Sequence, residues 1–346
     1  MSRPAGPGTL ATPLEVRERG PARDLAALAP EWDALWERCR HATPFQRPEW
    51  LLPWLDTFPP REPVVLEMRR DGRLVALAPL FCYQAGPERV LVPAGAGISD
   101  YLELLVDARE EAAALDALGR WLATTPRRWD RLDLLDLHPT SPLLGPWVPG
   151  GWTAVIEPHD ACPVLVLDGG TDRPAAIPAG QLARLRRARR HTARAGVARV
   201  EVADRGTLDR ALDELFRLHH EAWAARGGAG VLADPRVQAF HRRAAPGLLG
   251  RGVLRLYLLR LDGDVIAALY ALFERHGAYC YLQGFDPAHH RLSPAMQLLG
   301  AVIEDAAARG LPWIDFLRGR EPYKYGWGAR DAPTMRMRVF RPAAAA

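Results

Sequence analysis

The fold is decided by the stretch VVLEMRRDGRLVALAPLF at residues 64–81, which returns in similar form as RLYLLRLDGDVIAALYALF at residues 255–273. Each stretch reads as an apolar strand, an Asp-Gly pair and a second apolar strand, with the pairs at Asp71-Gly72 and Asp262-Gly263. An Asp-Gly pair between apolar runs favours a tight hairpin, because a type I′ turn needs positive φ at both central residues. The sequence therefore predicts one β-hairpin in each half of the chain.

The segments that follow the two hairpins also match each other. A strand at 101–107 parallels one at 279–286, a helix near 110–123 parallels one at 294–309, and a strand opened by tryptophan stands at 129–136 and again at 313–317. Another helix is predicted at 208–226, where an apolar stripe ends at two glycines. A duplication explains this repetition. We expect an α/β fold with a mixed sheet, in two similar domains at 1–160 and 161–346.

The composition is that of an ordinary globular protein, with 48% hydrophobic and 25% charged residues. The formal net charge of +4 suits an anionic ligand but does not require nucleic acid. The four cysteines, Cys39, Cys82, Cys162 and Cys280, lie far apart and form no CxxC pair or Cys/His cluster. We therefore expect reduced, buried thiols and no metal site.

The sequence also predicts a cytoplasmic location. Residues 1–13 are rich in Gly and Pro and lack an apolar core, so they are not expected to act as a signal peptide. No stretch approaches the roughly 18 consecutive apolar residues that a membrane span needs.

Lys324 is the only lysine of the chain, which also contains no asparagine. In a sequence that uses arginine so consistently, a surviving lysine marks a position where arginine fails. An ammonium group is more compact than a guanidinium group and loses its proton when it is desolvated. Lys324 lies in the charged, glycine-punctuated loop 318–330, and such loops carry function more often than packing. The alternative interpretation is chance survival on a solvated turn.

The order hairpin, strand, helix, strand resembles the core of the GNAT acyltransferase fold, present here twice. The C-terminal half carries YLQGFDP from Tyr281, SPA from Ser293, EDAAARG from Glu304 and DFLRGREPYKYGWG from Asp315. These motifs, and TPFQRPEWL from Thr43, resemble the CelD/BcsL type of GNAT acetyltransferase, which is associated with cellulose and exopolysaccharide biosynthesis. The two-domain plan is also similar to the FemABX aminoacyl-transferases, which share an arginine-rich segment leading into the second domain.

The resemblance implies an acyltransferase with its donor site in the second domain. The donor is acetyl-CoA or another acyl-CoA as co-substrate, and the acceptor is an amine or hydroxyl of a sugar, glycan precursor or small metabolite. Transfer is direct, through a tetrahedral intermediate and without a metal. Two alternatives stay open: a FemABX-like transferase that uses aminoacyl-tRNA, which we favour less, and an inactive GNAT-fold scaffold that binds an anionic partner.

The expected phosphate site departs from the family pattern. GNAT enzymes hold the CoA pyrophosphate at a glycine-rich turn that opens a helix, where backbone N–H groups and the helix dipole favour anions. By resemblance, the phosphate contacts fall on His290, Arg291, Ser293 and Ala295. Ser293 replaces the first glycine and Pro294 lacks an N–H, so a carrier-protein or tRNA donor also stays open.

The catalytic candidates lie in and before the lysine loop. Asp315 is expected on the last repeated strand, where it could orient or deprotonate the acceptor amine, or pair with Arg318 or Arg320. Lys324 could neutralise a phosphate or stabilise the oxyanion. The GNAT resemblance implies that Tyr323 or Tyr325 protonates the leaving thiolate, and both are expected to point away from Lys324 if the segment is extended.

Other candidates lie outside this loop. Arg187 and Arg190 belong to an arginine run at 184–194 whose helical spacing predicts an anion-binding face or a solvated one. His219 falls on the apolar stripe of its helix, which favours a core-edge histidine over a base. The acceptor is expected to lie between the domains, and the candidates for holding it are Asp100, Tyr101, Gln283 and Arg318.

Overall fold

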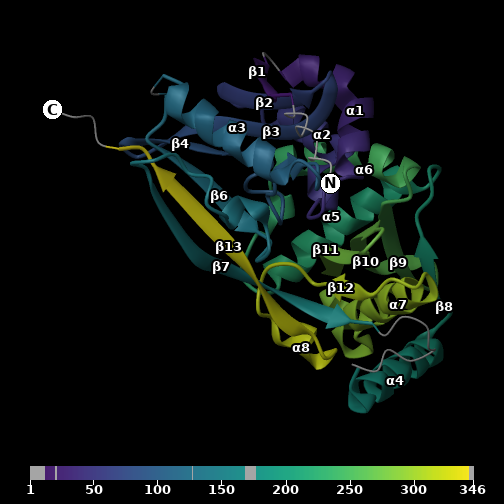
Figure 1. Ribbon diagram of the computed structural model, residues 1–346. Coiled ribbons are helices and arrows are strands. Elements are labelled where there is room, and N and C mark those ends of the chain that lie inside the picture. The colour runs from purple at the N-terminus through teal and green to yellow at the C-terminus, as the bar shows by residue number, and fades with distance from the viewer. Residues whose placement is uncertain (1–11, 20–21, 127, 168–176, 343–346) are drawn as a thin grey trace, which may run out of the picture.

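The computed structural model describes residues 12–19, 22–126, 128–167 and 177–342. All of its strands belong to one mixed sheet, in the order β1-β2-β3-β4-β6-β13-β7-β12-β11-β10-β9-β8, with β5 paired to β3 (Figure 1). Residues 1–11, which hold most of the Gly/Pro-rich N-terminal segment, lie outside the described residues.

The elements of the N-terminal half end with β6. Its strands are β1 (Glu15–Arg19), β2 (Glu62–Arg70), β3 (Arg73–Ala85), β4 (Glu88–Pro93), β5 (Leu105–Val106) and β6 (Arg131–Leu137). Its α-helices are α1 (Ala29–Trp36), α2 (Pro48–Thr57) and α3 (Glu111–Thr124).

The long strand β7 (Thr153–Val166) leads into the C-terminal half. The strands there are β8 (Ala198–Val202), β9 (Leu254–Leu261), β10 (Asp264–Glu274), β11 (Gly277–Phe285), β12 (Trp313–Asp315) and β13 (Arg330–Phe340). The α-helices are α4 (Ala179–Ala195), α5 (Leu208–Ala224), α6 (Pro235–Gly250), α7 (Pro294–Ala308) and α8 (Pro322–Gly326).

Both predicted hairpins are present, as β2–β3 and β9–β10. The φ angles are 49° and 78° at Asp71 and Gly72, and 51° and 100° at Asp262 and Gly263. Positive φ at both central residues is the type I′ geometry, whose twist matches that of the flanking strands. All four turn residues are exposed to solvent. The local sequence therefore favours both turns, and at the second one Asp262 also exchanges hydrogen bonds with Val197.

The predicted duplication is confirmed in the strand order. In each half, a first strand pairs antiparallel with a second, the second antiparallel with a third, and the third parallel with a fourth: β2-β3-β4-β6 and β9-β10-β11-β12. One expected match is wrong, because the partner of β11 in this pattern is β4 and not the segment 101–107. Only Leu105 and Val106 of that segment form a strand, and Tyr101 has a φ of 56°, which interrupts extended backbone.

The two halves exchange their last strands. β7 follows β6 in the chain but pairs with β12 and β13, whereas β13 pairs with β6 and β7. In Figure 1 the two long strands lie side by side and run from the N-terminal half down to the C-terminal half. The expected boundary at 160/161 falls inside β7, which passes it without a break. The division into domains at that residue stays a proposal.

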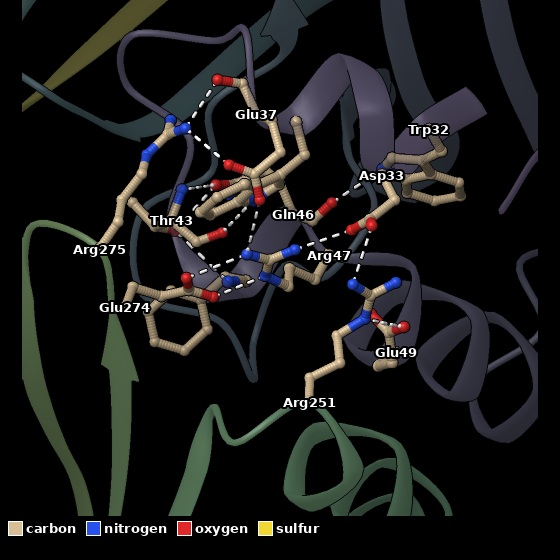
Figure 2. Close-up of polar contacts among 12 residues, drawn as sticks. Trp32, Asp33, Glu37, Thr43, Gln46, Arg47, Glu49, Arg251, Glu274 and Arg275 are labelled. Carbon is tan, nitrogen blue, oxygen red and sulfur yellow. Dashed lines mark hydrogen bonds and ion pairs between the residues drawn. The ribbon is translucent and has the colours of Figure 1, made fainter. Parts of the chain in front are cut away.

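A buried ionic cluster joins the halves on the side that Figure 2 shows. Arg47, whose side chain is 6% exposed, binds Asp33 at 2.7 Å and both carboxylate oxygens of Glu274 at 2.6 and 3.0 Å. Its guanidinium carbon lies 3.6 Å from the ring centre of Trp36, and Arg275 covers the same ring at 4.7 Å. Asp33 and Trp36 come from α1 and Glu274 from β10, so this cluster spans the two halves of the sequence.

Candidate functional site

The central feature of the site is an opening between β11 and β12. The two strands are parallel, but they pair only through Ala278 with Ile314 and Tyr279 with Asp315. β12 ends at Asp315 and the chain turns away at Leu317, whose φ is 58°, while β11 continues to Phe285. A β-bulge also leaves Tyr281 out of register with β10. Bulges are common beside active sites, because they redirect side chains and interrupt pairing.

A cavity of about 1040 Å³ fills this opening. Helices on opposite faces of the sheet contribute to its walls, because α5 and α6 pack into one apolar core and α4 and α7 into another. The polar and charged residues among those that line it are Asp100, Gln181, Arg184, His219, Arg226, Cys280, Tyr281, Gln283, Arg318, Glu321, Tyr323 and Lys324. A pocket of this size, apolar with a few convergent polar groups, is typical of small-molecule sites.

Lys324 lies on the cavity wall with its ammonium group bound by the loop itself. Nζ donates to the carbonyl oxygens of Leu317, Arg318 and Gly319 at 3.0, 2.8 and 3.0 Å, and pairs with Glu321 at 2.9 Å. The residue is 2% exposed. Three carbonyls that converge on one point suit a compact ammonium and not a planar guanidinium. This geometry explains why lysine is retained, and it assigns Lys324 to holding the loop. Its catalytic role stays a prediction.

Asp315 and Tyr101 form a buried pair that joins the two halves. The Tyr101 hydroxyl donates to Asp315 at 2.6 Å, and the Leu317 N–H donates to the same carboxylate at 2.7 Å. Burial raises the pKa of Asp315 to about 6, although both hydrogen bonds lower it. Neither residue lines the cavity. The ion pair expected as the alternative role of Asp315, with Arg318 or Arg320, does not form, because the carboxylate faces Tyr101.

Asp100 and Arg318, both predicted to hold the acceptor, line the cavity as an ion pair across the halves. Arg318 also donates to Asp136 at 3.4 Å and to the carbonyl of Ser99 at 3.3 Å. Burial raises the pKa of Asp100, and Arg318 opposes that shift. The pair therefore places one positive and one negative group side by side on the cavity wall.

The two tyrosines beside Lys324 have different surroundings. The extended conformation under which both were expected to point away from Lys324 is not present, because residues 322–326 form the short helix α8. Tyr323 lines the cavity next to Gln283, whereas Tyr325 points outward and donates to Asp331 at 2.6 Å. Of the two, only Tyr323 is placed to meet a ligand in this cavity.

The predicted phosphate site at the start of α7 is partly in place. Ala295 lines the cavity, but Ser293, His290 and Arg291 do not. Ser293 precedes the helix as predicted, yet it adopts a left-handed conformation with φ 51° and its side chain makes no capping hydrogen bond. Since Pro294 has no N–H, the first free N–H of this helix belongs to Ala295.

The arginine run forms α4, which packs against α7 beside the cavity. Arg189 binds Glu304 through two bonds of 2.8 Å, and Gln297 donates to Thr192 at 2.7 Å. The remaining arginines of the run are exposed and make no ion pair or hydrogen bond within the described residues: Arg184, Arg186, Arg187, Arg190 and Arg194. Arg184 also lines the cavity. Among the described residues, the helix thus carries several exposed, unpaired arginines, one of which reaches the cavity wall.

Sequence reasoning missed several wall residues. His219 was expected at the core edge, yet it is both buried and on the cavity wall. Trp223 and Arg226 follow it at helical spacing and share that wall. Cys280 was expected to be buried and is only half-buried on the wall, whereas the other three cysteines are buried. The spacing of His219, Trp223 and Arg226 in the sequence indicates that they lie on one side of the chain. It does not show that this side lies against β11 and lines the cavity.

The equivalent opening in the N-terminal half is filled. β4 and β6 pair only through Val90 and Leu91, as β11 and β12 do through two residues. The space beside this opening measures only about 10 Å³ within the described residues. Gln46 occupies it, since its amide donates to the Tyr101 carbonyl at 2.6 Å. The described residues thus leave room for a ligand at one of the two repeated openings.

His241 is a buried polar residue that lowers the stability of the core next to the site. It is fully buried, and neither ring nitrogen has a hydrogen-bond partner within the described residues. Burial lowers its pKa to about 3. We expect His241→Leu to raise the free energy of unfolding by about 1–3 kcal/mol at pH 7.5, since an unsatisfied buried polar group costs about that much.

The pH dependence of this effect has a definite sign. Between pH 6.5 and 3 the unfolded chain binds one more proton at His241 than the folded chain does, so the stability of the wild type falls as the pH falls. Urea unfolding at pH 7.5, 6 and 5 should show the advantage of His241→Leu growing. The exposed His220→Gln serves as the control, and a constant difference across this range contradicts the assignment.

The comparisons with known proteins agree with this architecture. Residues 179–325 match the family model described as acetyltransferase (GNAT) domain, and this stretch runs from the start of α4 into α8 and holds most of the residues that line the cavity. Over this stretch the chain is similar to the GNAT acetyltransferase domain. No curated protein matches the chain at a significant level.

Three solved structures share the fold over nearly the whole chain. The crystal structure of FemX has a TM-score of 0.65 at 12% identity and covers 89% of this chain and 95% of its own. A conserved protein of unknown function from Bacteroides thetaiotaomicron has a TM-score of 0.59 at 9% identity, with coverages of 90% and 97%. The C-terminal domain of a putative lysylphosphatidylglycerol synthetase from Agrobacterium fabrum has a TM-score of 0.55 at 13% identity, with coverages of 90% and 91%.

Within the described residues, no group of three or more His, Cys, Asp or Glu side chains is arranged to hold a metal ion. None of the helices in the same part of the chain is both long and apolar enough to cross a membrane.

Proposed function

We propose that the protein is an acyltransferase that binds an acyl-CoA, most simply acetyl-CoA, in the opening between β11 and β12. The observation that carries this proposal is the unpaired edge of β11 beyond Tyr279, which faces a cavity large enough for a ligand. An exposed strand edge offers alternating N–H and C=O groups to an extended chain that contains amides. The arm that carries the thioester of CoA is such a chain.

The charges around the opening support the placement of the phosphates. The arginine face of α4 and the N-terminus of α7 lie on the same side of the cavity, and both favour anions. Arg187 and Arg190 are therefore proposed phosphate contacts, with His290, Arg291 and Ala295 at the second element. Arg184, which sequence reasoning did not single out, connects this face with the cavity.

The acceptor is proposed to enter from the α5 face, where the N-terminal half contributes Asp100. There an amine or hydroxyl would meet Gln283 and the Asp100–Arg318 pair. Tyr323 lines the cavity while remaining 41% exposed, and its hydroxyl, which is protonated at neutral pH, is suited to protonating the leaving thiolate. By its resemblance to the CelD/BcsL type, the acceptor is proposed to be a sugar, a polysaccharide precursor or a small metabolite, and the location cytoplasmic.

One observation favours a second candidate, a Fem-type transferase that takes an aminoacyl group from tRNA. The five unpaired arginines of α4 lie within eleven consecutive residues, which rise about 15 Å along a helix. This exceeds what two adjacent phosphates need and suits a polynucleotide backbone, which is bound mainly through its phosphates. The similarity to FemX shows the fold alone, so the donor must be decided by binding.

Calorimetric titration separates the candidates. Micromolar binding of acetyl-CoA supports the acyl-CoA transferase, and retention of tRNA without acetyl-CoA binding supports the Fem-type transferase. A protein that binds neither fits the inactive scaffold and contradicts both proposals. Thiol release from acetyl-CoA in the presence of glucosamine then tests turnover with an amino sugar.

We expect the double substitution Arg187→Glu, Arg190→Glu to weaken donor binding, and to do so more at low salt than at high salt. Both side chains are exposed, and exposed charges are screened beyond about 8–10 Å at near-physiological ionic strength. The measurement is the donor Kd from 20 to about 500 mM NaCl, bracketing that screening regime. The control is Arg205→Glu, Arg210→Glu, the same charge change at exposed arginines away from α4. An unchanged Kd and salt slope would leave this face as solvated surface.

A further inference from the structure

Few groups on the cavity wall are free to take a proton at neutral pH. The two carboxylates, Asp100 and Glu321, are each ion-paired, with Arg318 and Lys324. The Cys280 thiol and the hydroxyls of Tyr281 and Tyr323 carry their protons at neutral pH, because the ordinary pKa values of these groups lie above it. Among the described residues that line the cavity, His219 is the base that no ion pair engages.

Close backbone packing holds the His219 ring at the wall. α5 lies directly on β11 because Gly284 has no side chain: a Cβ there would lie 2.3 Å from the His219 backbone nitrogen. On the other side, Gly230 with φ 70° lies against the ring, and a Cβ there would be 2.4 Å from Cε1. Two glycines thus let the main chain enclose His219, which is 3% exposed.

The ring is neutral and has no protein partner. Burial lowers the pKa of His219 to about 4, and the charges of His220 on the same helix and of Arg226 in the turn after it add to this shift. No hydrogen bond reaches either ring nitrogen within the described residues, and Nδ1 is fully buried. Gln283 on β11 likewise leaves its buried Oε1 without a partner. Nδ1 of His219 and Oε1 of Gln283 are enclosed by protein, whereas Nε2 of His219 is not fully buried, so it is the ring nitrogen that a ligand in the cavity can reach.

We propose that Nε2 of His219 accepts the proton of the attacking acceptor group and that the side-chain amide of Gln283, on the same cavity wall, orients that group. This inference rests on the proposed acyltransferase function. The acceptor nitrogen or oxygen forms a bond to the acyl carbon while its proton passes to the imidazole, and the carbonyl π electrons move to the oxygen. When the tetrahedral intermediate collapses, the C–S bond breaks and the thiolate takes the Tyr323 proton. The proton on His219 returns the phenolate to its neutral form through solvent.

The test follows thiol release from acetyl-CoA, with water and then hydroxylamine as the nucleophile, so that it needs no knowledge of the natural acceptor. His219→Ala is expected to lower kcat about a hundredfold, the usual contribution of a positioned general base. His219→Gln, which keeps hydrogen-bonding capacity but cannot take the proton, should be equally slow. The matched control is His220→Ala, because the next residue is an exposed histidine outside the cavity wall.

Chemical rescue separates proton transfer from support of the fold. Added imidazole should restore part of the activity of His219→Ala, which has space for it, and should not restore that of His219→Gln. Thermal unfolding checks that both variants fold. Activity within threefold of wild type in the folded variants, or loss without imidazole rescue, overturns the role of His219 while the proposed function stands. A wild-type protein that binds acetyl-CoA but releases no thiol to either nucleophile overturns the proposed function and this inference together.

Discussion

Lys324→Arg is expected to lower the free energy of unfolding by about 2–3 kcal/mol and to slow acyl transfer at least tenfold. The larger side chain enters a site that is 2% exposed, and overpacking of this kind costs about 1–3 kcal/mol. The guanidinium also cannot reach three carbonyls that converge on one point, so part of the loop 317–319 loses its hydrogen bonds. Because Leu317 and Arg318 line the cavity, the loss of order reaches the ligand site.

The control for Lys324→Arg lies in the same loop. Arg320 is 70% exposed at its side chain and pairs only with Asp331, so Arg320→Lys makes the reverse exchange without a converging set of carbonyls. It should leave unfolding and turnover unchanged. Urea unfolding measures the stability of both variants, and steady-state kinetics measure their turnover. If Lys324→Arg unfolds like the wild type and turns over normally, the lysine is retained by chance.

Arg47→Met is expected to cost about 3–5 kcal/mol, because it leaves the carboxylate of Glu274 buried without its cation. The Glu274 side chain is 8% exposed, and Arg47 is the residue that binds it (Figure 2). The substitution also removes the stacking of the guanidinium on Trp36 at 3.6 Å. Urea unfolding should show a lower midpoint, and acyl transfer should fall with it, since the cluster joins the two halves that form the cavity.

Two further variants make the Arg47 result specific. Arg120 pairs with Asp116 at the surface, where the side chains are 59% and 69% exposed, so Arg120→Met should cost no more than about 1 kcal/mol. The double variant Arg47→Met, Glu274→Leu removes the stranded carboxylate and should recover much of the lost stability. If Arg47→Met costs less than 1 kcal/mol, or the double variant is the less stable of the two, the cluster does not join the halves as described.

The sequence by itself determined the local elements and their repetition. The Asp71-Gly72 and Asp262-Gly263 turns require positive φ, and their neighbours alternate or run apolar, so both hairpins follow from interactions between residues close in the chain. The same holds for α5, α7 and the arginine helix α4, whose spacing is readable at helical period. The likeness of the two halves is also visible in the sequence alone.

The tertiary structure decided everything that depends on which distant residues meet. The exchange of β7 and β13 follows from strand pairing across the chain, for which local propensity carries no information. From the sequence, Lys324 was predicted to act on a ligand, Asp315 to act on the acceptor or pair with an arginine, and His219 to lie at the edge of the core. Folding turns the lysine inward to three carbonyls, closes the aspartate against Tyr101 and places the histidine beside β11. Burial and partner choice are properties of the assembled halves, because each depends on backbone that lies far away in the sequence.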